Sequence, residues 1–240
     1  MTTSNRRTRI SGGGGVEKER PITFPGPMIR SLLDGRKTQT RRLVKDVPIG
    51  AERAVMQIAA PTCIDLAPGT PFFRWLLPAG VSAGFHCPYG VPGDRLWVRE
   101  TFAAFAAEGR PTTPRDARYV VLRDGAQVYA DGETHPPLAN YAAGAFDDIK
   151  WRPSIHMPRW ASRITLEVVS VRVERVQSIT EEDARAEGMA VTAPHLMHGA
   201  LASMSARENF AVLWDSINSK RAPWASNPWV WAVEFRRVQP

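Results

Sequence analysis

The last third of the chain constrains the fold most strongly, because two strand-like segments there enclose two helical ones. Apolar and polar residues alternate over residues 164–168 and 171–173, and the phase slips at Val169 and Ser170. That slip predicts one long strand with a bulge. Residues 229–235 predict the final strand, in which Trp229, Trp231, Val233 and Phe235 share one face.

Two helices are predicted between these strands. Thr180 and Asp183 have the spacing of a capping box, and Gly188 suits the end of that helix. A second helix is predicted over residues 205–217, where large apolar side chains recur three and four positions apart.

The N-terminal half predicts further short elements. A strand at Ile22 and Phe24 precedes a helix over residues 27–35, and two more strands follow at 37–44 and 96–99. Short strands interleaved with helices favour an α+β fold with a small mixed β-barrel as its core.

Three segments lie outside this core pattern. Residues 1–20 predict a disordered basic tail, since they combine arginines with a run of glycines. Residues 46–90 and 103–150 are rich in Pro and Gly, and we interpret them as two long, irregular insertions on the core. Within the second insertion, residues 119–122 and 127–129 predict a hairpin.

Composition narrows the functional classes. The 240 residues carry a formal net charge of +7, which favours a polyanionic partner but also fits a solvated basic surface. Only two cysteines are present, which excludes a disulfide framework and favours a reducing cytoplasm. Cys63, His86 and Cys87 lack the spacing of a zinc site. No metal, cofactor or membrane span is predicted, and a monomer is assumed.

The sharpest motif is the basic segment of residues 35–42, Gly-Arg-Lys-Thr-Gln-Thr-Arg-Arg, which Arg30 and Lys45 extend. At a helix end followed by a strand, it presents backbone N–H groups, hydroxyls and fixed positive charge together. That combination suits a phosphate or a nucleotide oxygen. The alternative is a solvated basic edge strand whose charge prevents unwanted pairing.

Within this segment, Gly35, Lys37, Thr40 and Arg42 have the spacing Gly-x-Lys-x-x-Thr-x-Arg, which resembles the signature of the ASCH domain family in the PUA-like superfamily. Three further stretches are similar to ASCH proteins encoded by tailed phages and prophages, namely residues 91–102, 156–164 and 227–235. The resemblance covers residues 21–238. It implies a PUA-like mixed β-barrel with flanking helices, on which the two insertions sit.

The resemblance also implies an activity. The family includes small amidohydrolases that remove the acyl group from N4-acetylcytidine with a Lys, a Thr and a distant Glu, which correspond here to Lys37, Thr40 and Glu187. The expected partner is a modified nucleoside or nucleic acid in the cytoplasm, the host cytoplasm if a phage encodes the chain. Other ASCH proteins are thought to bind or cut RNA, so a non-catalytic RNA- or DNA-binding module and a ribonuclease remain alternatives.

The chemistry of such a triad is coherent. A threonine hydroxyl is a weak nucleophile and needs an adjacent base. Lys37 can act as that base if burial or nearby arginines lower its pKa. Glu187 orients the lysine or shuttles a proton, although a glutamate in a last helical turn is more often solvated. Arg42 shares a strand face with Thr40 and suits the substrate oxygen or the developing oxyanion.

Further substrate-binding candidates are Arg36 and Arg41 in the motif, and Glu100, His156 and Trp160 outside it. Glu100 is either a substrate-facing acid or half of an ion pair with Arg99 or a motif arginine, and we favour the ion pair. His156 is expected at the rim of the pocket. Trp160 or Trp151 either stacks on a base or belongs to the core. The insertions are expected to confer substrate choice and not chemistry.

Overall fold

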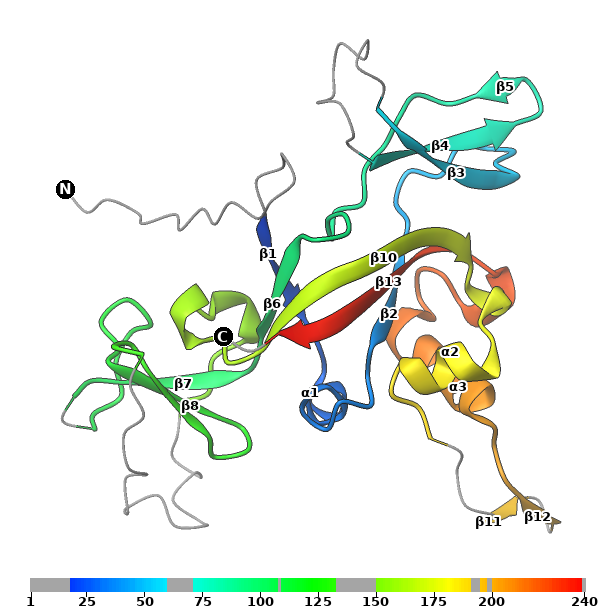
Figure 1. Cartoon of the computed structure of the whole chain (residues 1–240). Coiled ribbons are helices and arrows are strands. Elements are labelled where there is room, and N and C mark those ends of the chain that lie inside the picture. The colour runs from blue at the N-terminus through cyan, green and yellow to red at the C-terminus, as the bar shows by residue number, and fades with distance from the viewer. Residues whose placement is uncertain are drawn as a thin grey trace.

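A mixed five-stranded sheet lies at the centre of the computed structural model (Figure 1). Its strands are β1 (Glu19–Thr23), β2 (Gln39–Leu43), β6 (Arg95–Arg99), β10 (Thr165–Arg175) and β13 (Trp229–Val238). The hydrogen-bonded order is β1-β6-β10-β13-β2, in which β1 and β6 are parallel and the other neighbours are antiparallel. The structure describes residues 18–59, 71–107, 109–132, 150–190, 195–197 and 200–238.

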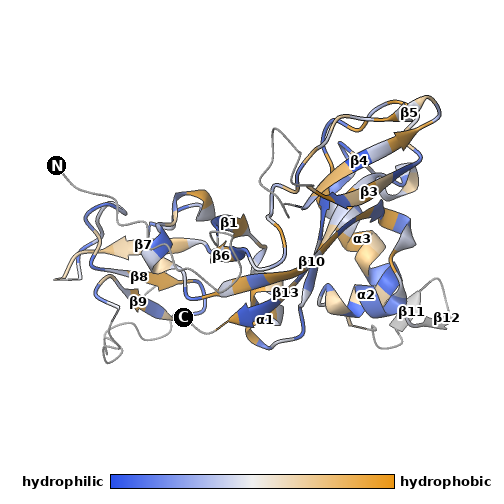
Figure 2. Cartoon of the chain, turned by 45° about the horizontal axis from the view of Figure 1, so that its top comes forward, coloured by the Kyte–Doolittle hydropathy of each residue, from blue (hydrophilic) through white to orange (hydrophobic). Residues whose placement is uncertain are grey.

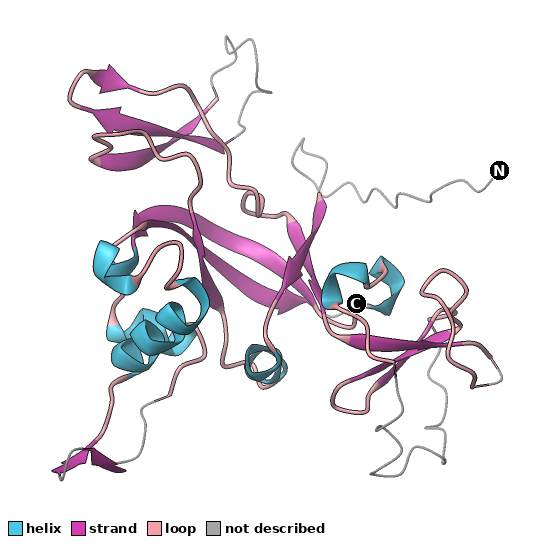
Figure 3. Cartoon of the chain, turned by 180° about the vertical axis from the view of Figure 1, so that it is seen from behind, coloured by secondary structure: helices cyan, strands magenta, loops and turns pink. Residues whose placement is uncertain are grey.

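The described α-helices are α1 (Gly26–Leu33), α2 (Glu181–Ala186) and α3 (Ala206–Asn218). Helix α1 connects β1 to β2, whereas α2 and α3 pack on each other beside β2 (Figures 1 and 3). Capping boxes begin both α2 and α3, which confirms the predicted helices. Short 3-10 turns occur at η1 (Ser154–His156), η2 (Arg159–Ala161), η3 (Val176–Ser178) and η4 (Trp224–Ser226).

Each insertion contains a three-stranded antiparallel sheet. The strands are β3 (Arg53–Ile58), β4 (Pro71–Leu77) and β5 (Gly80–Val81) in the first, and β7 (Phe102–Phe105), β8 (Tyr119–Leu122) and β9 (Gln127–Tyr129) in the second. The two sheets lie at opposite ends of the central sheet (Figures 1 and 2). A two-stranded hairpin, β11 (His195–Met197) and β12 (Ala200–Ala202), lies between α2 and α3 in the chain.

The predicted hairpin in the second insertion is confirmed as β8 and β9, but the interpretation of both insertions as irregular is wrong, because each contains a three-stranded sheet. Pro71 and Gly80 lie at the ends of β4 and β5, where they leave the ladder intact. Because the prediction relied on Pro and Gly content, it missed the apolar strand between these two residues.

Two apolar clusters cover the two faces of β13. One joins α1 to the central sheet and includes Leu32, Leu96 and Val233, none more than 2% exposed. The other joins α2 and α3 to the sheet and includes Phe210 and Val230. Burial on both faces explains why β13 reads as an almost continuous apolar run.

Aromatic side chains fix the first insertion to the central sheet. Phe72, Phe73 and Trp75 of β4 are all buried. The Phe73 ring centre lies 4.8 Å from that of Trp231, and the Trp75 ring centre lies 5.1 Å from that of Trp229. The β3–β5 sheet is therefore attached through β4 to β13.

The structure confirms the α+β class and the bulge in β10, where the register with β13 shifts between Val168 and Ser170. No ladder joins the edge strands β1 and β2 among the described residues, so the PUA-like barrel stays a prediction. Strand β1 begins at Glu19, just inside the predicted tail, of which residues 1–17 lie outside the described part. No helix in the described ranges is long and apolar enough to cross a membrane.

Candidate functional site

The basic motif links α1, α2 and β13. Gly35 ends α1 with a φ of +72°, the left-handed conformation that glycine adopts most easily. The Lys37 N–H then donates to the Ser31 carbonyl at 3.0 Å, and the Thr38 N–H donates to the Ala186 carbonyl at 2.8 Å. These bonds hold the loop before β2 against the end of α2.

Lys37 and Glu187 form a buried ion pair at this junction. Although 150 positions separate them in the chain, Lys37 Nζ donates to Glu187 Oε2 at 2.7 Å and to the Glu187 carbonyl at 2.9 Å. The two side chains are 0% and 2% exposed. Burial lowers the pKa of Lys37, although the Glu187 carboxylate opposes that shift. The structure thus brings together two of the three predicted triad residues.

Arg41 supports Glu187 from the other side. Its guanidinium is fully buried and lies 3.4 Å from Glu187 Oε1, 2.6 Å from Glu174 Oε1 and 2.9 Å from Asp183 Oδ2. Gln39 accepts a further hydrogen bond from the same guanidinium. The Arg41 donors therefore face protein carboxylates, which differs from the expected role in substrate binding.

The carboxylate partners of Arg41 belong to a wider network that sequence reasoning missed. Arg172 of β10 pairs with Glu174, Asp183 and Glu234. Burial by itself raises the pKa of Asp183, but the charge of Arg41 and the Gln39 amide hold that pKa below its usual value. The signal in the sequence is weak, because these carboxylates come from three separate elements.

A cavity of about 490 Å³ lies beside the motif. Thr40, Arg42 and Glu187 line it, and α3 supplies the opposite wall with residues such as Leu213 and Trp214. Thr40 is only 3% exposed. Within the described part of the chain, its hydroxyl makes no hydrogen bond, and none joins it to Lys37. The third predicted triad residue therefore lies at the cavity wall, close in sequence to Lys37 but not bonded to it.

Phe24 is a site residue that the sequence analysis treated only as part of a strand. Its ring lies 5.5 Å from Lys37 Nζ and 5.1 Å from the Arg42 guanidinium carbon. Arg42 also donates to the Thr23 carbonyl at 2.6 Å. The Arg42 Nε is buried and has no hydrogen-bond partner in the described residues. Both cations thus lie against the ring of Phe24.

The remaining motif and acid candidates lie away from this cavity. Arg36 is exposed and pairs with Asp34 at 2.8 Å. Glu100 is buried in an ion pair, as favoured, but its partner is Arg163, at 2.8 Å and 3.0 Å. The predicted partner Arg99 instead lies against the Trp97 ring.

The histidine and tryptophan candidates lie outside the cavity wall. His156 is exposed in η1, a turn whose Ser154 reaches the cavity wall. Trp160 and Trp151 pack against the apolar clusters of the second insertion, which supports the core interpretation of both. Cys87 is a buried free thiol, and Cys63 lies outside the described residues.

Comparison of the chain with protein-family models, with curated proteins and with solved structures gave no match. The resemblance to the ASCH family therefore depends on the motif residues themselves.

Proposed function

We propose that this chain is an amidohydrolase that removes the acyl group from an N4-acylated cytidine or a related modified nucleoside. The observation that carries the proposal is the buried Lys37–Glu187 pair beside a cavity whose wall includes Thr40. The proposal includes an ASCH-type, PUA-like core. It also includes a reducing cytoplasmic compartment, with which the free thiol of Cys87 is compatible.

Lys37 is the proposed general base. Burial lowers its pKa and so increases the share of the neutral amine, the form that has a lone pair. In that form its two N–H donors keep the bonds to Glu187 and the lone pair takes the Thr40 proton. Contact between Thr40 and Lys37 is required in the substrate complex, and catalytic hydrogen bonds often shorten only at that stage.

Thr40 is the proposed nucleophile. Its Oγ1 bonds to the acyl carbonyl carbon while its proton passes to Lys37 Nζ. The tetrahedral oxyanion then collapses, the carbon–nitrogen bond breaks, and Lys37 returns the proton to N4 of the departing cytidine. Lys37 then takes a proton from water, whose oxygen bonds to the acyl carbon of the threonine ester. The bond between that carbon and Thr40 Oγ1 breaks, Lys37 returns the proton to Oγ1, and the carboxylic acid is released.

Arg42 is the proposed oxyanion-stabilising residue. It lies on the same face of β2 as Thr40, lines the cavity and has a buried Nε with no partner in the described residues. A fixed donor aimed at a developing oxyanion contributes about 10²–10³ in rate.

A nucleic-acid-binding module without catalysis is the second candidate. It is favoured by one observation: Lys37 is enclosed by Glu187 and does not line the cavity. In that case the ion pair is purely structural. A ribonuclease, the third candidate, follows only from the resemblance.

The test is a hydrolysis screen. The purified chain is incubated with acylated cytidines and with an unmodified RNA oligonucleotide, and products are separated by chromatography. The proposal predicts release of cytidine, which the shape-conserving Thr40→Val abolishes. Cleavage of the RNA indicates a ribonuclease instead. A folded wild-type protein that releases no acyl group from any substrate contradicts the amidohydrolase.

A further inference from the structure

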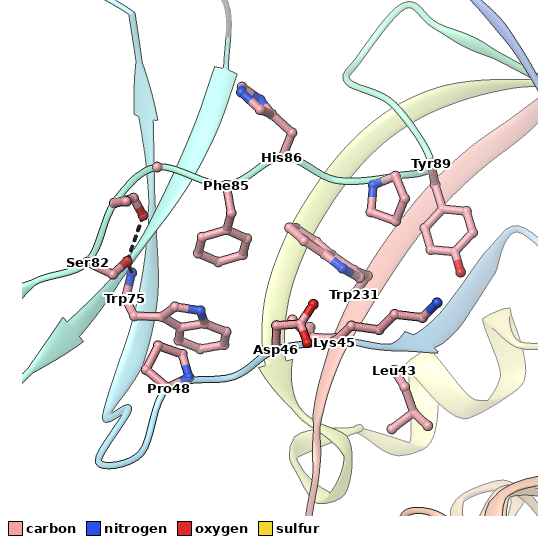
Figure 4. A pocket seen from close by; sticks show the side chains of 14 residues that line it. Leu43, Lys45, Asp46, Pro48, Trp75, Ser82, Phe85, His86, Tyr89 and Trp231 are labelled. Atoms are coloured by element: carbon pink, nitrogen blue, oxygen red, sulfur yellow. Dashed lines mark hydrogen bonds between the residues drawn. The ribbon is translucent and has the colours of Figure 1, made fainter.

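A second cavity, of about 550 Å³, lies between the end of β2 and the first insertion (Figure 4). Trp75 and Trp231 are each 2% exposed and line its depth. Phe85 and Tyr89 are half-buried and also line the cavity. The Phe85 ring stacks on Trp75 with a centroid distance of 5.1 Å and an interplanar angle of 12°. The cavity is therefore lined by aromatic rings that pack on one another.

The two cavities adjoin. Leu43, Lys45 and Tyr89 line both of them. Lys45 is exposed and forms no hydrogen bond or ion pair with any described residue. An available cation thus lies at the boundary between the proposed acyl-cytidine cavity and the aromatic cavity.

We propose that the aromatic cavity binds the base of a nucleotide adjacent to the acylated cytidine, so that the substrate is a single-stranded oligonucleotide and not a free nucleoside. Lys45 then contacts the phosphate that joins the two nucleotides. This inference rests on the proposed function of the first cavity, because it takes the acylated base to lie there.

Three observations favour this occupant. Successive bases of a single strand stack on aromatic side chains in most proteins that bind such strands, and a cation follows the phosphate. The volume is within the range of about 300–1,000 Å³ for ligand pockets. Asp46 adds a carboxylate to the lining, which suits the donors on a base edge.

The first experiment compares substrates. The kcat/KM is measured for N4-acetylcytidine as a nucleoside and within a single-stranded trinucleotide. We expect the trinucleotide to be preferred at least about tenfold, since one base stack supplies that much. Phe85→Leu keeps an apolar side chain against Phe73 and Trp75 but removes the flat ring. It should bring the ratio of the two kcat/KM values close to one.

The second experiment measures binding without catalysis. The affinity of an unmodified single-stranded oligonucleotide is followed against salt concentration. Lys45→Gln should reduce the slope of log K against log salt by about 0.7, the value for one lost phosphate contact on a single strand. Lys220→Gln removes the same charge from an exposed residue that lines neither cavity and should leave the slope unchanged.

The outcomes separate the two proposals. Equal kcat/KM for nucleoside and trinucleotide, with no effect of Phe85→Leu on the ratio, overturns the second subsite and leaves the amidohydrolase standing. Oligonucleotide binding that depends on Phe85 and Lys45, without any hydrolysis, supports base binding in the aromatic cavity but overturns the amidohydrolase and the acylated substrate. A folded protein that neither binds nor hydrolyses overturns both. Thermal melting curves of each variant establish that it is folded.

Discussion

Lys37 shows how burial tunes chemistry and constrains stability at a single residue. Its ammonium and the Glu187 carboxylate are both removed from water, at 0% and 2% side-chain exposure. Such a pair contributes little net stability, because desolvation offsets the attraction between the charges. Removal of only one of the two side chains is costly, however, because it leaves the other as an unpaired buried charge.

The effects of substituting Lys37 and Glu187 on the free energy of unfolding are therefore predicted to be strongly coupled. Lys37→Met should lower the free energy of unfolding by about 3–5 kcal/mol, because it leaves the Glu187 carboxylate buried without its main partner. The double variant Lys37→Met/Glu187→Leu should recover much of that loss. Urea denaturation of the wild type, Lys37→Met, Glu187→Leu and the double variant gives the coupling energy. A double variant whose loss of unfolding free energy equals the sum of the two single losses contradicts this coupling.

Thr40 offers a kinetic prediction at the same scale. Thr40→Val should lower kcat for N4-acetylcytidine by at least about a thousandfold, because the nucleophile is lost. Combining it with Glu187→Gln should cost little more, since members of one catalytic unit act together. Thr38→Val is the matched control, as Thr38 is exposed and lines no described cavity. Substantial turnover by Thr40→Val contradicts the assignment.

At the scale of elements, the end of α2 is fitted closely against the motif loop. Gly188 has a φ of +91°, and a Cβ there would lie 3.0 Å from Ser31 Cβ and 3.4 Å from Lys37 Cβ. Both the backbone conformation and the close approach require glycine. This contact positions Lys37 through the neighbouring residue Glu187.

A pair of glycine variants separates these two requirements. Gly188→Ala and Gly125→Ala both place alanine in the left-handed region, which costs about 1–2 kcal/mol each. Only Gly188 also has close neighbours, since nothing lies within 4 Å of a Cβ at Gly125. Gly188→Ala should therefore lose more stability and also lower kcat. Equal losses of stability in chemical denaturation, with kcat unchanged in both variants, contradict the proposed role of α2.

The charged network between β2, β10 and α2 makes the fold sensitive to acid. A hydrogen bond from Ser170 and the charge of Arg172 lower the pKa of Glu234, and the pKa of Asp183 is lowered as well. A carboxylate with a lower pKa in the folded state stabilises the protein above its unfolded pKa, about 4. That stabilisation is lost as the pH falls through the folded value.

Urea midpoints between pH 7 and pH 3 test this network. We expect the midpoint to fall below about pH 5. Arg172→Met should lower the midpoint at pH 7 and flatten its dependence on pH. Arg115→Met serves as the control, because Arg115 is exposed and forms no described ion pair. A pH profile of Arg172→Met that parallels the wild type contradicts the role of Arg172.

Elements with a local signal were predictable from the sequence. The capping box at Thr180, the hairpin around Gly125 and the bulge at Val169 each depend on a few neighbouring residues. Strand β3 was missed because all six of its residues are exposed or half-buried, so no clear alternation marks it. The Lys37–Glu187 contact has no local signal at all, and only the family resemblance indicated it. The Arg41 carboxylates were missed for the same reason.

At the scale of the molecule, the two insertions differ in what they contribute to the two cavities. The first supplies Phe85 and Tyr89 to the cavities beside β2. The described residues of the second supply none to either cavity, and its sheet lies at the opposite end of the central sheet (Figures 1 and 2). The expected role of the insertions in substrate choice is therefore proposed for the first one alone.

Replacement of residues 106–150 by a Gly/Ser linker tests this difference. The ranking of acylated cytidines by kcat/KM should stay the same, because the described residues of this segment contact neither cavity. The replacement uncovers Met157 and Trp160, which pack on the second insertion, so some stability is lost. A milder variant adds a Gly/Ser segment at the exposed Asp124–Gly125 turn and leaves that core covered. A changed ranking in the milder variant would mean that the second insertion reaches the substrate, and that the cavities beside β2 are not the whole of the binding site.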